Sequence, residues 1–401
     1  MSVSNHPNHP NKAAAVFLRC CYGYFVSGMV ILSFGAIMPS LIRDSGMNFA
    51  AAGGLISFMA VGNLMASFAF PAISAKAGLK HTITFWAFTI PVVLLLFSAV
   101  PPLPVMYILI FLIGLSRGSI TIINNQAVNQ IIPDPARHLN LLHCSFAVGA
   151  FTSPFLTALL IEMGMGWRMI LYLLAAMSVT SAISYRTMDY SLLKPPTGRK
   201  AVSEAAPRAA SSFLRCPDFY VIAFLLFFYL GLENCINGWF VTYLQGTGIM
   251  SETFATNLVS ITWVVIMIGR LTTARLSSFV RRNRLILIQT LGSSACFLIL
   301  ISASTLPVIT AALMGLGFFL AGIYPTCVAE GGQYIIGSTF GMSVLTAIAS
   351  LGGIMTPQLV GYLADSIGIT AAMGTLMINM VLMILFGVLN FIRSRSGEYR
   401  Q

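Results

Sequence analysis

The stretch that decides the fold is Val221-Ile-Ala-Phe-Leu-Leu-Phe-Phe-Tyr229-Leu-Gly-Leu-Glu233-Asn-Cys-Ile-Asn237-Gly-Trp239-Phe-Val-Thr-Tyr-Leu244. It is long and apolar enough to cross a bilayer as one helix, for which about 20 residues suffice. Near its middle, however, it carries a carboxyl group, Glu233. An ionisable side chain at that depth costs roughly 2.5 to 3.5 kcal/mol to insert, so it usually faces a polar interior and has a task. Glu233 is therefore the first functional candidate.

The composition shows that this stretch is typical of the chain. The protein has 401 residues, of which 57% are hydrophobic and 8% charged, and its mean hydropathy is +0.86. An ordinary soluble domain carries about 25% charged residues. The apolar stretches are continuous and about 20 residues or longer, whereas the strands of a membrane barrel alternate over about 10 residues. We therefore predict an all-α integral membrane protein.

Enzyme and metal signatures are absent from the sequence. There is no phosphate-cradling Gly-Lys-Ser/Thr loop and no HExxH motif, and the seven cysteines have no CxxC or Cys/His metal spacing. We predict no catalytic residues, no cofactor and no metal site. ATP-driven transport would require a separate subunit.

Breaking the apolar stretches at Pro, Gly and charge clusters predicts 12 transmembrane helices. A polar, Pro-containing stretch between the sixth and the seventh separates them into two six-helix bundles. The predicted helices cover residues 14–41, 50–75, 82–100, 104–132, 139–162, 167–187, 217–245, 253–280, 283–302, 306–332, 338–364 and 368–393.

The positions of Lys and Arg predict the orientation, because cytoplasmic loops retain positive charge. With the N-terminus inside, all but five of the 22 Lys and Arg residues lie at or near cytoplasmic ends, which also explains the net charge of +11 without nucleic acid as a partner. Arg43 and Arg168 fall outside, and three others lie within spans.

The predicted domains are a cytoplasmic tail (1–13), an N-terminal bundle (14–187), a basic cytoplasmic linker (188–216), a C-terminal bundle (217–393) and a second cytoplasmic tail (394–401).

A weak internal repeat supports two equivalent halves. An offset of 203 residues aligns the first span with the seventh and the fifth with the eleventh, and Glu233 meets Val30. Two halves of the same orientation imply a pseudo-twofold axis along the membrane normal and a polar site between them. The matched pairs include Phe25 and Phe228, Gly28 and Gly231, Gly35 and Gly238, Ser57 and Ser260, Gly149 and Gly352, and Pro154 and Pro357.

This arrangement, together with Gly166-Trp167-Arg168 between the fifth and sixth spans, resembles the major facilitator superfamily. The family's loop motif after the second span survives only as Ser74-Ala75-Lys76-Ala77-Gly78-Leu79-Lys80, without its Asp. Its second copy, around Gly269-Arg270-Leu271, also lacks the acid. The resemblance implies the major facilitator fold and transport by alternating access.

A closer resemblance, to the fucose and glucose/galactose permease branch, lies in the second half. Its residues are Tyr229-Leu-Gly-Leu-Glu233 with Gly238-Trp239, then Gly322-Ile-Tyr324-Pro325-Thr326, and Gly352-Gly353-Ile-Met-Thr356-Pro357 with Gly361-Tyr-Leu-Ala-Asp365. That branch implies sugar uptake coupled to protons or sodium. The fucose permease pattern has acidic residues in the first and fourth spans, and this sequence lacks both, so the coupling mechanism does not transfer with the fold.

If the resemblance holds, spans 1, 4, 7 and 10 line the cavity, so their polar residues are the first candidates. In the seventh span, Tyr229, Glu233 and Asn237 recur every four residues and share a helix face. That face could bind sugar hydroxyls, or Glu233 could carry a proton. In the fourth span, Arg117, Thr121 and Asn124 or Asn125 follow helical spacing. A guanidinium near mid-bilayer needs a counter-ion, which is either Glu233 or an anionic substrate.

The remaining candidates are weaker, and each has a structural alternative. Glu330 is the other acid inside a span, where it could couple protons or pack at a helix end. Asn63 lies in the second span, and Trp239 could stack on a sugar or simply pack. Tyr324-Pro325 is expected to break the tenth span, because proline lacks the backbone donor. We also expect small residues such as Gly114 and Gly118 to let helices approach closely.

From these residues we predict a secondary transporter of a small polar solute, a monosaccharide or related sugar, coupled to H⁺ with Na⁺ as the alternative ion. Other hypotheses are an exporter of amphipathic drugs, a transporter of organic anions or sugar acids, and a membrane sensor that does not transport. The expected partners are the small-molecule substrate and the lipid bilayer, and the protein is expected to be a monomer. We expect it in a bacterial inner membrane with both termini cytoplasmic.

Overall fold

The computed structural model describes residues 10–131, 135–191, 193, 213–335 and 339–398. In these ranges, 12 helical segments are long and apolar enough to cross a membrane, which confirms the predicted number. The prediction of an all-helical protein is likewise confirmed, since no strand occurs in the described part of the chain.

Two groups of helices pack side by side. In the N-terminal group, α2 packs on α4, α1 on α5, and α3 on α6. Its members are α1 (Pro10–Ser45), α2 (Phe49–Ala77), α3 (Leu79–Ser98), α4 (Leu103–Ile131), α5 (Pro135–Glu162) and α6 (Arg168–Arg186).

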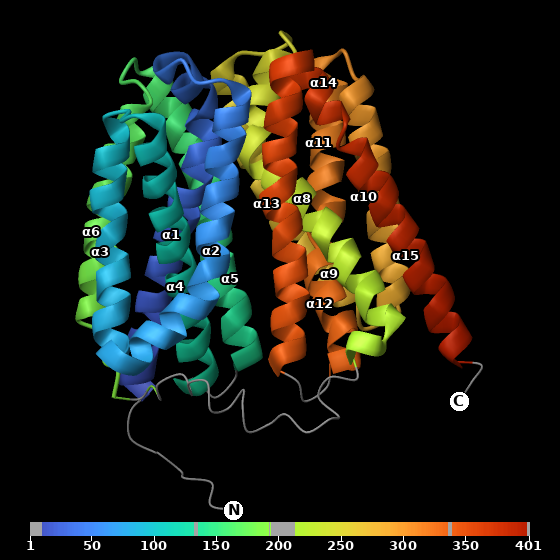
Figure 1. The fold of residues 1–401 in the computed structure, drawn as a ribbon, viewed down its shortest axis with the longest axis horizontal. Helices are drawn as coiled ribbons and strands as arrows, with labels where there is room; N and C mark the ends of the chain where they lie inside the picture. The colour runs from blue at the N-terminus through green and yellow to red at the C-terminus, as the bar shows by residue number, and fades with distance from the viewer. Residues whose placement is uncertain (1–9, 132–134, 192, 194–212, 336–338, 399–401) are drawn as a thin grey trace, which may run out of the picture.

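In the C-terminal group, α8 packs on α13 and α15, and α10 packs on α11 and α15. Figure 1 shows the two groups next to each other, with the first turn of α1 and the last turn of α15 at one end, here called the terminal side. The opposite end is the far side. The members are α8 (Pro217–Gly246), α9 (Glu252–Leu276), α10 (Arg282–Ser302), α11 (Leu306–Leu320), α12 (Ile323–Gly332), the short 3₁₀ helix η2 (Gln333–Ile335), α13 (Thr339–Ile367), α14 (Ile369–Gly374) and α15 (Met377–Glu398).

The repeat appears in how the helices begin and in how the groups meet. The Asn48 side chain caps α2 by accepting from the amide of Ala51 at 2.9 Å, and Ser251 caps α9 in the same way. These two caps are 203 residues apart. The groups meet mainly where α2 contacts α13, α5 contacts α9, and α1 contacts α8, with a smaller contact between α2 and α8. The first two contacts are equivalent under the repeat, as a pseudo-twofold relation requires.

Hydrogen bonds between the groups repeat the same symmetry. The hydroxyl of Ser57 on α2 donates to the carbonyl of Ile354 on α13 at 2.6 Å. The hydroxyl of Ser260 on α9 donates to the carbonyl of Phe151 on α5 at 2.5 Å. Both the donors and the acceptors differ by 203 residues. The same hydrogen bond between the two groups therefore occurs twice, at positions that are equivalent in the repeat.

Small residues allow the closest helix approaches, as expected for membrane bundles. A Cβ atom on Gly114 of α4 would lie 2.1 Å from the carbonyl oxygen of Met59 on α2. A Cβ on Gly35 of α1 would lie 1.9 Å from the carbonyl oxygen of Asn237 on α8, and 3.5 Å from the Cα of Gly238. Because Gly35 and Gly238 are equivalent in the repeat, α1 and α8 cross close to the pseudo-twofold axis.

The tenth span is broken one turn earlier than expected. Helix α11 ends at Leu320 and α12 begins at Ile323, so the interruption precedes Tyr324-Pro325 rather than falling on it. Pro325 has no amide hydrogen to bond with the carbonyl four residues earlier, that of Ala321, so the break appears there. The last span is also divided, between α14 and α15, and the sequence analysis did not predict that division.

The two Arg residues that the sequence places outside are both paired with acids at the far side. Arg168 Nη1 lies 2.9 Å from Asp44 Oδ2, and Trp167 Nε1 donates to the same oxygen at 2.8 Å. Arg43 Nη1 lies 3.5 Å from Glu252 Oε2. These two exceptions to the positive-inside pattern therefore add little net positive charge at that end. The predicted domain boundaries remain predictions, and most of the predicted linker, residues 192 and 194–212, lies outside the described residues.

Candidate substrate and proton site

The predicted face of α8 is present in the structure. The Tyr229 hydroxyl donates to Glu233 Oε1 at 3.1 Å, as their spacing of four residues allows. Tyr229 is buried at 2% exposure, whereas Glu233 and Asn237 are half-buried. The ring of Tyr324, at the start of α12, lies 6.2 Å from that of Tyr229. Glu233 is therefore oriented by one tyrosine and lies near a second.

Two arginines lie within electrostatic reach of Glu233. The stronger interaction is with Arg270 of α9, and the weaker is with Arg117 of α4. Neither guanidinium is within 4.0 Å of the carboxylate, since the salt bridges of the described chain join other residues. Both arginines are half-buried. A carboxylate thus interacts with one cation from each helix group without forming a closed ion pair.

The N-terminal group contributes further polar and aromatic side chains. The Arg117 guanidinium lies 5.8 Å from the ring centroid of Phe146 on α5, a cation–π distance. The Tyr24 side chain of α1 interacts with Thr121, and its ring packs edge-on against His143 at 5.4 Å. Tyr24 and His143 also interact electrostatically with Arg270. Arg270 therefore faces the N-terminal group as well as Glu233.

These side chains form one set, here called the central cluster, which joins both helix groups. A carboxyl group, two guanidinium groups, an imidazole, hydroxyls and aromatic faces can bind a polar solute and exchange a proton. The central cluster consists of Tyr24, Arg117, Thr121, His143, Tyr229, Glu233, Arg270 and Tyr324.

Three of the predicted site residues have their hydrogen bonds or close packing contacts inside one helix group, although the Trp239 ring also lies 6.1 Å from that of Phe49 on α2. Asn124 is fully buried, where its amide donates to the Cys20 carbonyl at 3.3 Å and its oxygen accepts from Tyr185 at 3.0 Å. Trp239 is fully buried, and its indole nitrogen donates to the Pro357 carbonyl at 3.3 Å. Asn63 lies against Gly118, where α2 approaches α4.

The other predicted residues lie near the central cluster or on the terminal side. The carbonyl of Asn237 is at the closest approach of α1 and α8. The buried side-chain oxygen of Asn125, one residue beyond Asn124 on α4, has no hydrogen-bond partner. Glu330 is buried near the end of α12, where it interacts with Gln333 and more weakly with Arg282. Glu330 therefore belongs to the terminal side and is separate from the central cluster.

The sequence analysis did not select Tyr24, His143 or Arg270. The family pattern directed attention to spans 1, 4, 7 and 10, whereas His143 and Arg270 are on spans 5 and 8. A signal did exist for Arg270, because it is a permanent charge inside an apolar span, as Arg117 is. Tyr24 carries no comparable signal, because an aromatic residue in a membrane helix is common.

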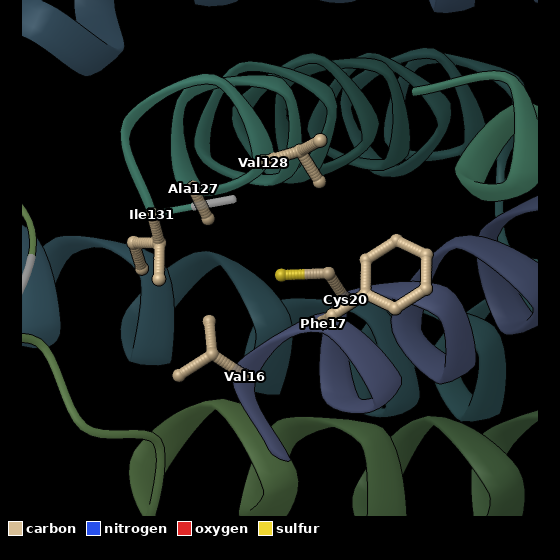
Figure 2. Close-up of a pocket in the computed structure, with 6 residues that line it drawn as sticks. All are labelled: Val16, Phe17, Cys20, Ala127, Val128 and Ile131. Carbon is tan, nitrogen blue, oxygen red and sulfur yellow. The ribbon is translucent and has the colours of Figure 1, made fainter. Parts of the chain in front are cut away.

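A small apolar pocket lies elsewhere, between α1 and α4 (Figure 2). It is lined by Val16, Phe17, Cys20, Ala127, Val128 and Ile131. None of these belongs to the central cluster, and a thiol is the most polar side chain among them. The part of the chain that the structure describes also contains no group of three or more His, Cys, Asp or Glu that could hold a metal ion.

Comparisons with known proteins agree with this architecture. The model of the Major Facilitator Superfamily matches residues 20–333. Among curated proteins, a protein TsgA homolog of Erwinia tasmaniensis is 22% identical over 357 residues, covering 88% of this chain and 89% of its own.

Solved structures show the same fold. A mutant of the nucleoside transporter NupG superposes with a TM-score of 0.77 at 13% identity, covering 95% of this chain and 99% of its own. A D-xylose–proton symporter gives 0.76 at 13% identity, covering 95% and 97%. The E. coli fucose:proton symporter FucP gives 0.63 at 18% identity, covering 94% and 99%. At these identities the likeness shows the fold.

Proposed function

Because this chain belongs to the Major Facilitator Superfamily and is a membrane transporter rather than an enzyme, we propose that it carries a monosaccharide or related sugar together with a proton. It does so as a secondary active transporter, in which access alternates between the two sides. The observation that carries the proposal is the central cluster, which places Glu233 of one helix group within reach of arginines from both. A solute bound there contacts both groups, so its binding responds to their relative movement.

Glu233 is the proposed proton carrier. It is the carboxyl group of the central cluster, it is half-buried, and it accepts a hydrogen bond from Tyr229 without a closed salt bridge. A carboxylate locked in an ion pair exchanges its proton poorly, whereas one held near two cations can change state when they move. Sodium is the alternative coupling ion. Uptake into proteoliposomes driven by a sodium gradient instead of a proton gradient distinguishes the two.

The first prediction concerns Glu233→Gln. The amide keeps the shape and the hydrogen bonding of the side chain but cannot carry a proton. In proteoliposomes, we expect counterflow of a labelled monosaccharide to stay within about twofold of wild type, because exchange requires no net proton movement. Accumulation driven by an inward proton gradient should be lost. Accumulation equal to that of wild type would remove Glu233 from the carrier role.

Glu330→Gln is the matched control for this experiment. Glu330 is also a buried acid within a span, but it lies on the terminal side with Gln333 and Arg282. We expect this variant to keep gradient-driven accumulation. If it loses accumulation while Glu233→Gln keeps it, the carrier is Glu330. If the wild-type protein neither binds nor exchanges any sugar, the result would favour an exporter of amphipathic compounds or a sensor.

The orientation is also part of the proposal. We place the terminal side in the cytoplasm of a bacterium, with the far side outward. The distribution of Lys and Arg supports this choice, and the pairing of Arg43 and Arg168 with acids removes its main exceptions. Protease access to the two tails in right-side-out and inverted vesicles tests it directly.

A further inference from the structure

The central cluster contains more positive than negative groups. Arg117 and Arg270 contribute two guanidinium groups, and Glu233 contributes the carboxyl group that interacts with both. The Nε atom of Arg270 is buried and has no hydrogen-bond partner. Arginine stays protonated in proteins, so neither guanidinium can lose its charge to suit the site. At least one positive charge in the described cluster is therefore left without a negative group.

The surroundings of these two arginines favour an anionic ligand over a neutral one. Arg117 lies over the Phe146 ring, and Arg270 faces Tyr24 and His143 of the opposite helix group. None of these supplies a carboxylate. The planar guanidinium matches a carboxylate with two parallel hydrogen bonds, and such charged bonds are roughly twice as strong as those to a hydroxyl. The site is therefore better suited to a carboxylate than to a neutral sugar.

From this charge imbalance we propose that the cargo is a sugar acid, such as a hexuronate, whose carboxylate binds between Arg117 and Arg270. This inference rests on the proposed function and specifies its substrate class. Glu233 and the substrate carboxylate then compete for the same cations. When Glu233 takes up a proton, both guanidinium groups become available to the substrate, and when it loses the proton, it replaces the substrate. One proton and one monoanion move together, so the step transfers no net charge.

The test compares matched pairs of sugars. D-Glucose and D-glucuronate, like D-galactose and D-galacturonate, share their ring hydroxyls and differ in the carboxylate at carbon six. We expect the purified protein to bind the uronates about tenfold or more tighter, the factor that a hydrogen bond to a charged group provides. Uptake of uronate into proteoliposomes should follow the pH gradient and remain unchanged when a potassium diffusion potential is imposed. A neutral sugar moving with a proton would respond to that potential.

Variants at Arg270 connect this preference to the site. Arg270→Gln should reduce uronate binding about tenfold or more and reduce binding of the neutral sugar much less, while Arg270→Lys should recover part of the difference. Arg275→Gln is the control, because Arg275 is an exposed residue further along α9. Thermal unfolding of each purified variant separates loss of the fold from loss of the site.

The outcomes distinguish this inference from the function on which it rests. Equal or tighter binding of neutral sugars, with no selective effect of Arg270→Gln, overturns the sugar-acid inference and leaves sugar transport in place. Uronate uptake that responds to the imposed potential overturns the inference that one proton moves together with one monoanion. If no sugar and no uronate binds or is transported, the proposed function itself fails.

Discussion

Glycine residues control how closely individual backbones approach in this protein. At Gly114, a Cβ would lie 2.1 Å from the Met59 carbonyl oxygen, whereas nothing lies within 4 Å of a Cβ at Gly374. Gly114→Ala must therefore push α4 away from α2, and Gly374→Ala need not move anything. The contact at Gly114 depends on backbone atoms, which cannot turn aside as a flexible side chain could.

We expect Gly114→Ala to destabilise the purified protein by about 1–3 kcal/mol, the usual cost of overpacking. Gly374→Ala should be close to neutral. Thermal unfolding in detergent, followed by intrinsic fluorescence, measures both. A melting temperature of Gly114→Ala equal to that of wild type would show that the two helices separate without cost.

The residue scale also shows what the sequence could and could not predict about the site. A spacing of four residues correctly joined Tyr229 to Glu233, because a helix face follows from local geometry. Helical spacing also placed Asn124 or Asn125 with Arg117, but tertiary packing directs the Asn124 amide group to Cys20 and Tyr185. Arg270 comes from a helix that the family pattern did not emphasise. Which neighbours a side chain contacts depends on how the helices pack together. The periodicity of a single sequence does not show that packing.

At the scale of elements, the spans were predictable because about 20 apolar residues are needed to cross a bilayer, and few other structures contain apolar stretches of that length. The starts of α2 and α9 lie one residue from the predicted ones, and Asn48 and Ser251 cap them in the structure. Interruptions inside spans were harder to locate. Pro325 signalled the break before α12, but the missing hydrogen bond belongs to a carbonyl four residues earlier. The division between α14 and α15 has no proline or charge to mark it, only a single glycine, Gly374, at the end of α14.

The break in the tenth span leads to a prediction. Pro325→Ala supplies an amide that can bond to the Ala321 carbonyl, so α11 and α12 should join more nearly into one helix. We expect a higher melting temperature and a slower turnover in sugar counterflow, because the joint between the two segments becomes stiffer. Pro71→Ala, in α2, is the control, because the chain remains helical through that proline. An unchanged turnover would show that the break in the tenth span has no part in the transport cycle.

At the scale of the whole molecule, polar contacts hold the two helix groups together on the far side. Asp365 at the end of α13 accepts hydrogen bonds from the first amides of α2, those of Phe49 at 2.7 Å and Ala50 at 2.9 Å. Glu252 at the start of α9 accepts from Ser40 of α1 at 2.6 Å. A carboxylate at the N-terminus of a helix also interacts favourably with the helix dipole.

Asp365→Asn should loosen this side. The neutral amide keeps one acceptor oxygen but loses the second hydrogen bond and the charge, and the charge alone contributes about 0.3–1 kcal/mol. We expect faster hydrogen exchange in peptides covering residues 49–57 at the start of α2, measured by mass spectrometry. Asp44→Asn is the matched control, because Asp44 binds Trp167 and Arg168 inside one group. Equal exchange in both variants would show that Asp365 does not hold the groups together.

The approach of Gly35 to Gly238 means that two separate codons control one helix crossing. The two residues are equivalent in the repeat, but a Cβ on Gly35 would lie 3.5 Å from the Cα of Gly238, whereas a Cβ on Gly238 would meet Ile56 of α2, so this crossing is not fully symmetric. In a homodimer of six-helix proteins, a single glycine codon would govern both sides of such a contact. In one chain with two halves, the two codons can mutate separately. Each glycine leaves room for a different neighbour, so a substitution at Gly35 would press on the Asn237 carbonyl and one at Gly238 on the Ile56 side chain.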